Sequence, residues 1–178
     1  SWQSAFGIIY GILVLRESLA VAHPSWHPVH KLIGPIDVCH WAGIKCNLRE
    51  DVQAIFLNNA NLTGTIPREI MGFAGSLTTL HLFTNANLIG TLPREMGELS
   101  NLEVLFLHET SIAGSIPTSF GSLAGLNKLL LDHTHLTGTM PQEVCDLRLH
   151  ALESLHADCL GPHAKVQCST LTCCTSCH

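Results

Sequence analysis

Eight cysteines are the residues of this 178-residue chain with the most definite chemistry. They lie toward the two ends of the sequence and leave the stretch between Cys46 and Cys145 without any. An even number of cysteines around a cysteine-free centre is typical of disulfide-stapled ends, which form in a secretory or extracellular environment. The complete set is Cys39, Cys46, Cys145, Cys159, Cys168, Cys173, Cys174 and Cys177.

Zinc binding is the competing interpretation of the C-terminal cysteines. Cys174 and Cys177 have CxxC spacing, but no second CxxC follows them. Redox-active CxxC motifs occur near a βαβ pattern, which this sequence lacks. We therefore predict disulfides rather than a cysteine metal site.

Histidines form the second group of chemically capable residues, and there are 12 of them. Imidazole and carboxylate groups bind transition metals, and five such residues fall on two neighbouring segments. Metal binding needs a shared orientation that the spacing does not establish, and no catalytic helper residues surround them. We expect a solvated polar rim, with no metal and no cofactor, from His108, Glu109, Asp132, His133 and His135.

Composition and motifs exclude several functions. The sequence has no phosphate-binding Gly-Lys-Ser/Thr loop, no G-x-S-x-G nucleophile elbow and no HExxH. Its formal charge of −5 provides no basic stripe for a phosphate backbone. With 46% apolar residues the chain can bury a core. We predict a folded protein that is not an enzyme and does not bind nucleic acid.

An internal repeat must position these residues. Four Gly-x-apolar-Pro tetrads begin at Gly64, Gly90, Gly114 and Gly138, at intervals of 26, 24 and 24 residues. The pattern LxxLxLxxTxLxG precedes each one and is clearest before Gly114 and Gly138. Such a period is the signature of a solenoid, in which each repeat buries its apolar face on the next.

Each repeat predicts one short strand followed by a helical turn. In the LxL core Leu105 and Leu107 point inward and Phe106 points outward, because side chains alternate along a strand. We expect the tetrad proline to take the first helical position, with an acidic residue after it where negative charge suits a helix N-terminus. We expect Gly72, Gly97 and Gly121 to end the turns in the left-handed conformation.

The motif LxxLxLxxTxLxGxIPxxxGxL resembles the plant-type leucine-rich repeats of receptor-like kinase ectodomains and polygalacturonase-inhibiting proteins. The resemblance implies an α/β right-handed solenoid with a parallel sheet on the concave face, a short 3-10 or irregular convex side and cysteine caps. It also implies a second irregular strand near Gly64 and its equivalents. This chain departs from the pattern, since the turn column that carries Asn in many such repeats is here Ala60, Asn85 or Ala86, Thr110 and Thr134.

Residues 37–46 resemble the N-terminal cap of that class, which implies a Cys39–Cys46 disulfide and a Trp41 that packs on the first repeat. The C-terminal cysteines look more like caps of diatom and related algal repeat proteins. The six cysteines there allow fifteen connectivities. Since adjacent Cys173 and Cys174 rarely bond each other, we expect Cys145 and Cys159 each to pair with the tail.

The N-terminal segment admits two interpretations. An apolar face of Trp2, Phe6, Ile9 and Leu13 favours a capping helix. The alternative is the remnant of a signal or membrane anchor, because residues 5–15 are uninterruptedly apolar yet too short to span a bilayer. We predict an N-terminal cap over 1–50, repeats over 51–144, and a truncated last repeat with a cysteine-rich cap over 145–178.

The outward strand positions provide the candidate binding site. Exposed apolar patches and aromatic anchors mark partner surfaces. We predict a recognition module, extracellular or on a cell surface, with a membrane anchor as a candidate outside this segment. Inhibition of a secreted polysaccharide hydrolase is the alternative, and a His/Asp metal-dependent activity ranks far below. Asn61 begins a glycosylation sequon. The predicted concave-face contacts for a protein or peptide ligand are Phe56, His81, Phe83, Phe106, His108, Leu130, Asp132 and His156.

Overall fold

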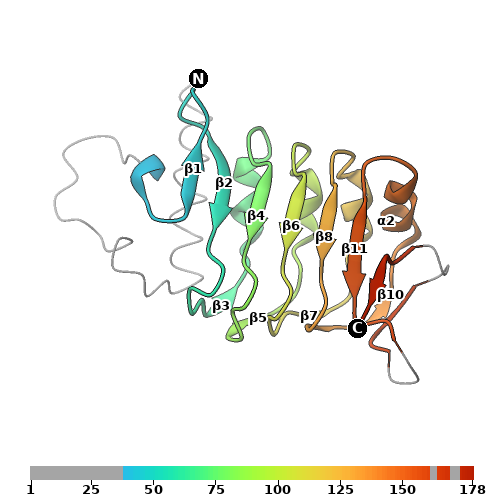
Figure 1. Cartoon of the computed structure of the whole chain (residues 1–178). Coiled ribbons are helices and arrows are strands. Elements are labelled where there is room, and N and C mark those ends of the chain that lie inside the picture. The colour runs from blue at the N-terminus through green and yellow to red at the C-terminus, as the bar shows by residue number, and fades with distance from the viewer. Residues whose placement is uncertain (1–37, 161–163, 169–172) are drawn as a thin grey trace.

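The computed structural model describes residues 38–160, 164–168 and 173–178. The helix predicted from Trp2 to Leu13, and its alternative as an anchor, lie outside the described residues. Over the described ranges the chain is a stack of repeats, with strands along one side and helical turns along the other (Figure 1). Among these residues, none of the helices has the length and apolarity that a membrane crossing requires.

The main sheet runs through the whole stack in the order β1-β2-β4-β6-β8-β11-β13. Every neighbouring pair is parallel except β1 and β2, which are antiparallel. Leu80 lies opposite Leu105, and Leu105 opposite Leu129, so the predicted leucine columns are confirmed. The strands are β1 (Ile44–Cys46), β2 (Val52–Phe56), β4 (Thr79–His81), β6 (Val104–Phe106), β8 (Lys128–Leu130), β11 (Ser154–Ala157) and β13 (Ser176–Cys177).

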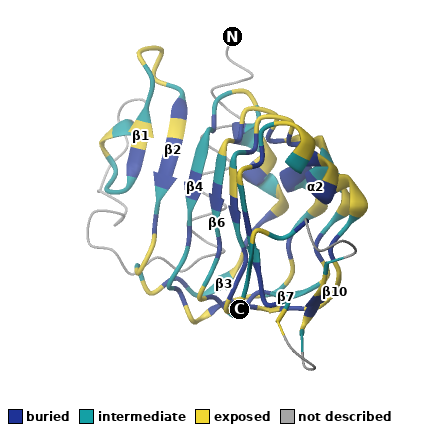
Figure 2. Cartoon of the chain, turned by 45° about the vertical axis from the view of Figure 1, so that its right-hand side comes forward, coloured by how far each residue is buried: buried dark blue, intermediate teal, exposed yellow. Residues whose placement is uncertain are grey.

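Alternation along the strands builds the core. Leu105 and Leu107 have no exposed surface, whereas Phe106 between them is half-buried on the outer side. Figure 2 shows this change of burial from residue to residue along the strands. Each buried leucine stabilises the stack by about 1.5–3 kcal/mol. Because the columns are continuous, one hydrophobic cluster extends from Ile44 to Cys173.

A second level of short ladders follows the main strands. β3 (Gly64–Thr65) pairs with β5 (Leu88–Ile89), β7 (Ala113–Gly114) with β9 (His135–Leu136), and β10 (Gly138–Thr139) with β12 (Val166–Gln167). All three pairs are parallel. They confirm the irregular second strand that the family resemblance implies.

The tetrad prolines lie one position earlier in the helical turns than predicted. Pro93 has an extended backbone and precedes the turn as its N-cap, where its carbonyl accepts the first hydrogen bond, from Met96 N at 3.1 Å. Pro67, Pro117 and Pro141 do the same. The turns are η2 (Val38–His40), η3 (Arg68–Phe73), η4 (Arg94–Glu98), η5 (Thr118–Ser122), α2 (Gln142–Asp146) and η6 (Leu147–Leu149).

The expected role of the turn glycines is wrong. Gly72, Gly97 and Gly121 lie inside their turns and do not have positive φ, which belongs instead to the tetrad glycines Gly64, Gly90, Gly114 and Gly138 and to Gly43. A Cβ on Gly97 would lie 2.3 Å from the backbone oxygen of Ser119 in the next turn. Gly97 is therefore required for the close approach of stacked helical turns, not for a left-handed ending.

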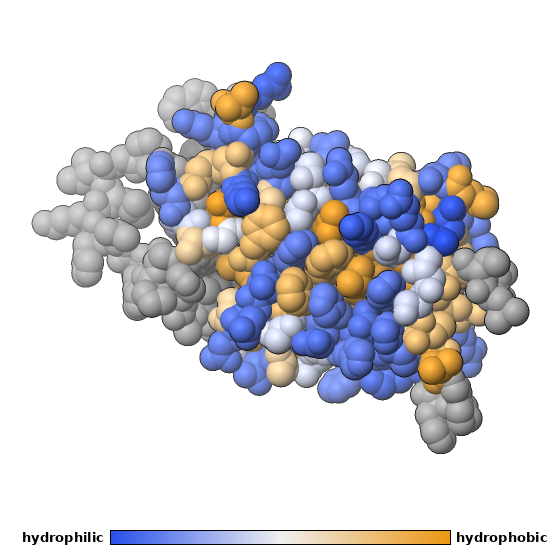
Figure 3. Space-filling model, viewed as in Figure 1, coloured by the Kyte–Doolittle hydropathy of each residue, from blue (hydrophilic) through white to orange (hydrophobic). Residues whose placement is uncertain are grey.

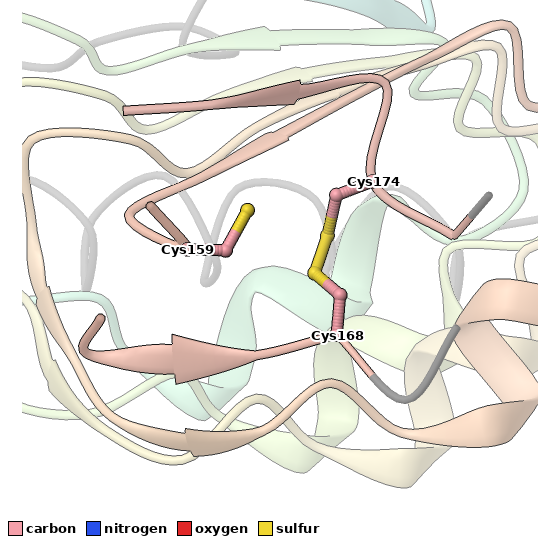
Figure 4. Close-up of side chains that lie close together, drawn as sticks. All are labelled: Cys159, Cys168 and Cys174. Atoms are coloured by element: carbon pink, nitrogen blue, oxygen red, sulfur yellow. A yellow bond between two sulfur atoms is a disulfide. The ribbon is translucent and has the colours of Figure 1, made fainter. Parts of the chain in front are cut away.

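Disulfides close both ends of the stack, and all eight cysteines are bonded. Cys39–Cys46 closes the N-terminal cap, where Trp41 packs against the core as the resemblance implies. Cys145–Cys173, Cys159–Cys177 and Cys168–Cys174 close the other end. Cys145 and Cys159 thus both reach the tail. The zinc interpretation of the CxxC is wrong, because Cys174 is bonded to Cys168 (Figure 4) and Cys177 is bonded to Cys159.

Candidate functional site

The strand register sets the outward face of the main sheet, which we call the concave face. Phe56 lies opposite His81, His81 opposite Phe106, and Phe106 opposite Leu130. His156 follows opposite Leu130 on β11. The structure therefore brings this predicted column together, one residue on each rung. Neighbouring side chains of the column stand about 4.8 Å apart along the sheet.

Five rings on β2, β4 and β6 and in the segments directly after β4 and β6 form a continuous cluster, which we call the aromatic patch. His81 stacks on Phe106 with ring centroids 4.4 Å apart, and Phe83 stacks on His108 at 4.5 Å. Phe56 meets His81 edge-on at 5.0 Å. The two stacks touch along Phe83–Phe106 at 6.2 Å and Phe106–His108 at 5.9 Å. The aromatic patch consists of Phe56, His81, Phe83, Phe106 and His108.

Mutual stacking leaves these side chains half-buried instead of fully exposed as predicted. Rings that stand one strand apart cover each other's faces while their outer edges stay open to solvent. In Figure 3 apolar residues lie across the middle of this face, with hydrophilic residues around them. The aromatic patch is thus a preordered surface, whose rings lose little conformational freedom when a partner binds.

Charge at the aromatic patch is kept low. Burial lowers the pKa of His81, and the neighbouring His108 lowers it further. Burial also lowers the pKa of His108, although Asp132 and Glu109 oppose the shift. Both imidazoles are therefore neutral at neutral pH. Lys45 Nζ lies 5.3 Å from the centre of the Phe56 ring and puts one cation at the N-terminal edge.

Beyond β6 the concave face becomes polar. Asp132, after β8, is only 7% exposed, so the expectation that it offers an open contact surface is wrong. Its Oδ2 lies 2.9 Å from His133 Nδ1, and its Oδ1 lies 3.9 Å from His156 Nδ1. The His178 ring lies 5.7 Å from that of His156. We call Asp132, His133, His156 and His178 the polar cluster.

The polar cluster differs from the five residues that the sequence places together. His135 is exposed on β9, in another sheet, and the Glu109 carboxylate accepts a 2.8 Å hydrogen bond from Thr84. His178 was missed, although the register of the last strand could have indicated it. Since β13 continues the sheet beside β11, with Ala157 opposite Cys177, His178 lies beside Asp158.

Two opposed effects set the protonation of the polar cluster. Burial raises the pKa of Asp132, but the hydrogen bonds from His133 and the backbone, together with His178 and His108, lower it overall. The hydrogen bond to Asp132 raises the pKa of His133. The carboxylate is therefore ionised at neutral pH, and His133 protonates more readily than a free imidazole.

Asp158 has a structural role, although strand alternation predicts that it faces outward. Its Oδ1 accepts a hydrogen bond from His133 N at 2.7 Å, and its Oδ2 accepts from Thr134 N at 3.1 Å. Lys165 Nζ lies 3.3 Å from the same carboxylate. Asp158 is 8% exposed, so it holds a turn of the neighbouring repeat and does not face a ligand.

Asn85 resolves the ambiguous turn column. Its side-chain oxygen accepts from Ala60 N and Leu62 N at 3.0 and 2.9 Å, and its amide donates to Leu57 O and Leu82 O at 2.8 and 2.7 Å. The side-chain hydroxyls of Thr110 and Thr134 donate within their own repeats, to Leu107 O and Leu131 O. Asn61, of the sequon, is exposed with φ 51°. Its glycosylation stays a prediction.

Comparisons with known proteins agree with this architecture. The Leucine Rich Repeat family model matches residues 101–123. The leucine-rich repeat receptor-like serine/threonine-protein kinase RGI4 of Arabidopsis thaliana is 41% identical over 75 residues, which are 42% of this chain. The match spans only 7% of that kinase's length.

Solved structures match over more of the chain. The BIR2 ectodomain from Arabidopsis thaliana has a TM-score of 0.73 at 24% identity and covers 95% of this chain and 97% of its own, which shows the fold. The plant peptide hormone receptor RGFR1 in complex with RGF2 has a TM-score of 0.58 at 34% identity and covers 67% of this chain and 21% of its own. With its stacked LxL strands, second ladder and cysteine caps, the chain has a leucine-rich-repeat fold similar to that of plant receptor ectodomains.

Proposed function

We propose that the chain recognises a peptide or protein ligand through the aromatic patch of its concave face and is not itself a catalyst. The observation that carries the proposal is the unbroken contact of five rings over three rungs. Aromatic side chains dominate the binding energy of protein interfaces because they bury much area and lose few rotamers. Leu130 extends this surface toward the polar cluster.

The chemistry of the aromatic patch favours an extended, largely uncharged peptide segment with apolar side chains. Its imidazoles are neutral, and its rings are apolar contact surfaces spaced by the strands, which suits side chains that repeat along an extended peptide. The similar receptor RGFR1 is described as a plant peptide hormone receptor, which supports a peptide as the class of ligand. Disulfides at both ends support an extracellular or cell-surface location.

We also propose the division into an N-terminal cap over 1–50, repeats over 51–144 and a C-terminal cap over 145–178. On this division the aromatic patch belongs entirely to the repeats. The polar cluster spans the last full repeat and the C-terminal cap. A fragment of residues 38–160 should therefore keep the aromatic patch and should lose His178 from the polar cluster.

A peptide display experiment tests the proposed recognition. A library of random linear peptides is selected on the wild-type chain, and the enriched peptides are measured against Phe106→Asp and Ile89→Asp. Ile89 is a matched control, because it is 50% exposed and lies on β5 outside the main sheet. We expect Phe106→Asp to weaken binding at least about tenfold, a loss of about 1.4 kcal/mol, and Ile89→Asp to leave it unchanged.

Circular dichroism melting separates binding from folding. We expect the Phe106→Asp variant to melt within a few degrees of the wild type, because Phe106 is on the outer side of the sheet. Equal binding by both variants would contradict the proposal, and unfolding would show that Phe106 belongs to the core. Loss of polygalacturonase activity on mixing would instead support the hydrolase-inhibitor alternative.

A further inference from the structure

We propose that the C-terminal end of the concave face binds one divalent transition-metal ion through Asp132, His156 and His178. The inference goes beyond peptide recognition and does not rest on it. It also departs from the sequence-based expectation of a plain polar rim. One donor atom from each of these side chains lies within 4.8 Å of the other two.

The register of three rungs creates this juxtaposition. Asp132 follows β8, His156 is on β11 and His178 follows β13, and these strands are parallel neighbours. In each strand the residue two positions away shares its face, so Leu130 and Asp132, His156 and Asp158, and Ser176 and His178 all point outward. The Asp158 carboxylate accepts hydrogen bonds from His133 N and Thr134 N, so it is not among the three candidate ligands.

An unsatisfied buried atom points to a ligand at this place. Asp132 Oδ1 is buried and has no hydrogen-bond partner among the described residues. Its 3.9 Å distance to His156 Nδ1 is too long for a hydrogen bond. Leaving a carboxylate oxygen buried and unpaired is costly, and a bound cation between these two atoms would remove that cost.

The remaining atoms are arranged as metal sites require. Asp132 Oδ2 is occupied by His133 at 2.9 Å, which orients the carboxylate and leaves Oδ1 for the metal. The backbone N of His178 donates to Ala157 O at 3.0 Å and anchors that residue beside the site. Donor atoms on one tetrahedral zinc ion lie about 3.3–3.4 Å apart. Bringing the three donor atoms from within 4.8 Å to that distance requires side-chain rotations, which the exposed His178 permits.

The donor set selects the class of ion. Two imidazoles and one carboxylate suit Zn²⁺, Cu²⁺ or Ni²⁺ and leave a fourth position open, whereas Ca²⁺ and Mg²⁺ require more oxygen ligands. The other cluster of potential ligands, Cys159, Cys168 and Cys174, does not compete, because its sulfurs are bonded in disulfides. Figure 4 shows the Cys168–Cys174 bond, and Cys159 is bonded to Cys177.

Titration of the oxidised wild-type chain with ZnCl₂ and with CoCl₂ tests the site. At about pH 7.5, where imidazoles are mostly neutral, we expect calorimetry to show one Zn²⁺ per chain. We expect Co²⁺ to give the visible d–d absorption of a low-coordinate site without sulfur charge-transfer bands. Asp132→Asn, His156→Gln and His178→Gln should each raise the Kd at least tenfold, while His135→Gln, in the same repeat, should not.

Melting curves without metal show whether each variant folds. His178→Gln is the safest variant, because its side chain is exposed and makes no core contact. Absence of heat with Zn²⁺, or equal affinity in wild type and folded His178→Gln and His156→Gln, would overturn the proposal. So would a loss of affinity confined to His135→Gln, or a preference for Ca²⁺ over Zn²⁺.

Discussion

The rungs from β2 to β6 and those from β8 to β13 share one sheet and one register, yet they present different chemistry. The first half carries the aromatic patch, with two ring stacks at 4.4 and 4.5 Å. The second half carries the polar cluster, centred on the nearly buried carboxylate of Asp132. Because the scaffold repeats, the residue types at the outward positions alone make one half a contact surface and the other a set of ligand atoms.

The turns behind the two halves are also held differently. A neutral carboxamide, Asn85, joins two repeats behind the aromatic patch by three hydrogen bonds to the preceding repeat, and it donates a further one to Leu82 O in its own repeat. A carboxylate, Asp158, joins the last repeats behind the polar cluster and is paired with Lys165. The buried leucine columns are therefore common to both halves. The side-chain hydrogen bonds that hold neighbouring repeats together differ from rung to rung.

Removing the Cys145–Cys173 disulfide should cause the largest loss of stability, and the loss should be concentrated in the polar half. The bond closes a loop of 28 residues in sequence separation. Cys145→Ala with Cys173→Ala should lower the free energy of unfolding by about 3–4 kcal/mol, measured by urea denaturation. Hydrogen exchange should show β11 and β13 losing protection before β4 and β6. Uniform loss of protection would indicate that the halves unfold as one unit.

Asn85→Ala should have the next largest effect, in the aromatic half. It leaves several buried backbone groups without partners, which should cost about 2–3 kcal/mol. Thr110→Val is the matched control from the next rung. Because it removes one hydrogen bond, to Leu107 O, it should cost about 1 kcal/mol. Equal urea midpoints for the two variants would show that the Asn85 network does not fasten the repeats together.

Asp158→Asn should cost less, about 1–2 kcal/mol, and act in the polar half. The substitution keeps one acceptor for His133 N and loses the charge that faces Lys165 and one acceptor for Thr134 N. Asp158→Ala should cost more than Asp158→Asn in the same denaturation assay. If neither substitution changes the free energy of unfolding, Thr134 and the backbone alone hold this turn.

Acidification should change the stability contributed by the histidines of the two halves in opposite directions, and these are the smallest expected effects. His81 and His108 have lowered pKa values, so the stability that they contribute is present above the ordinary value of about 6.5 and is lost as pH falls below it. His133 has a raised pKa, so its contribution is present below about 6.5 and is lost as pH rises through the raised value.

Melting at about pH 7.5 and pH 5.5 checks these signs. The double variant His81→Phe and His108→Phe should lose about 1–3 °C less than the wild type on acidification. His133→Gln should lose more than the wild type, because its pair with Asp132 is strongest when His133 is protonated. Identical pH profiles for all three proteins would remove the electrostatic part of the comparison between the halves.

Much of the fold was predictable because its cause is periodic. The leucine columns and the outward column from Phe56 to His156 follow from spacing and strand alternation, and the family resemblance implies the second ladder. The glycines of the helical turns were misinterpreted, since an internal Gly97 and a C-terminal one look alike in sequence. The difference lies in Ser119 of the next turn, 2.3 Å from where a Cβ would be.

The candidate site was predictable only in its aromatic half. Phe56, His81 and Phe106 lie one repeat apart, so that spacing alone aligns them. Asp132, His156 and His178 do not meet by spacing alone, because Asp158 occupies the intervening position and turns away into a backbone network. Whether a side chain faces solvent or a neighbouring turn depends on which donors the adjoining repeat presents.

The sequence by itself determined the repeat, the inward leucines, the cysteine-capped ends and the outward aromatic column, because each depends on residues at regular separations along one chain. Only the tertiary structure decided which C-terminal cysteines pair, which glycines face a neighbour and which imidazoles surround Asp132. These depend on distances between segments that sequence spacing does not encode. They are set when the cap folds back and adds β13 to the sheet beside β11.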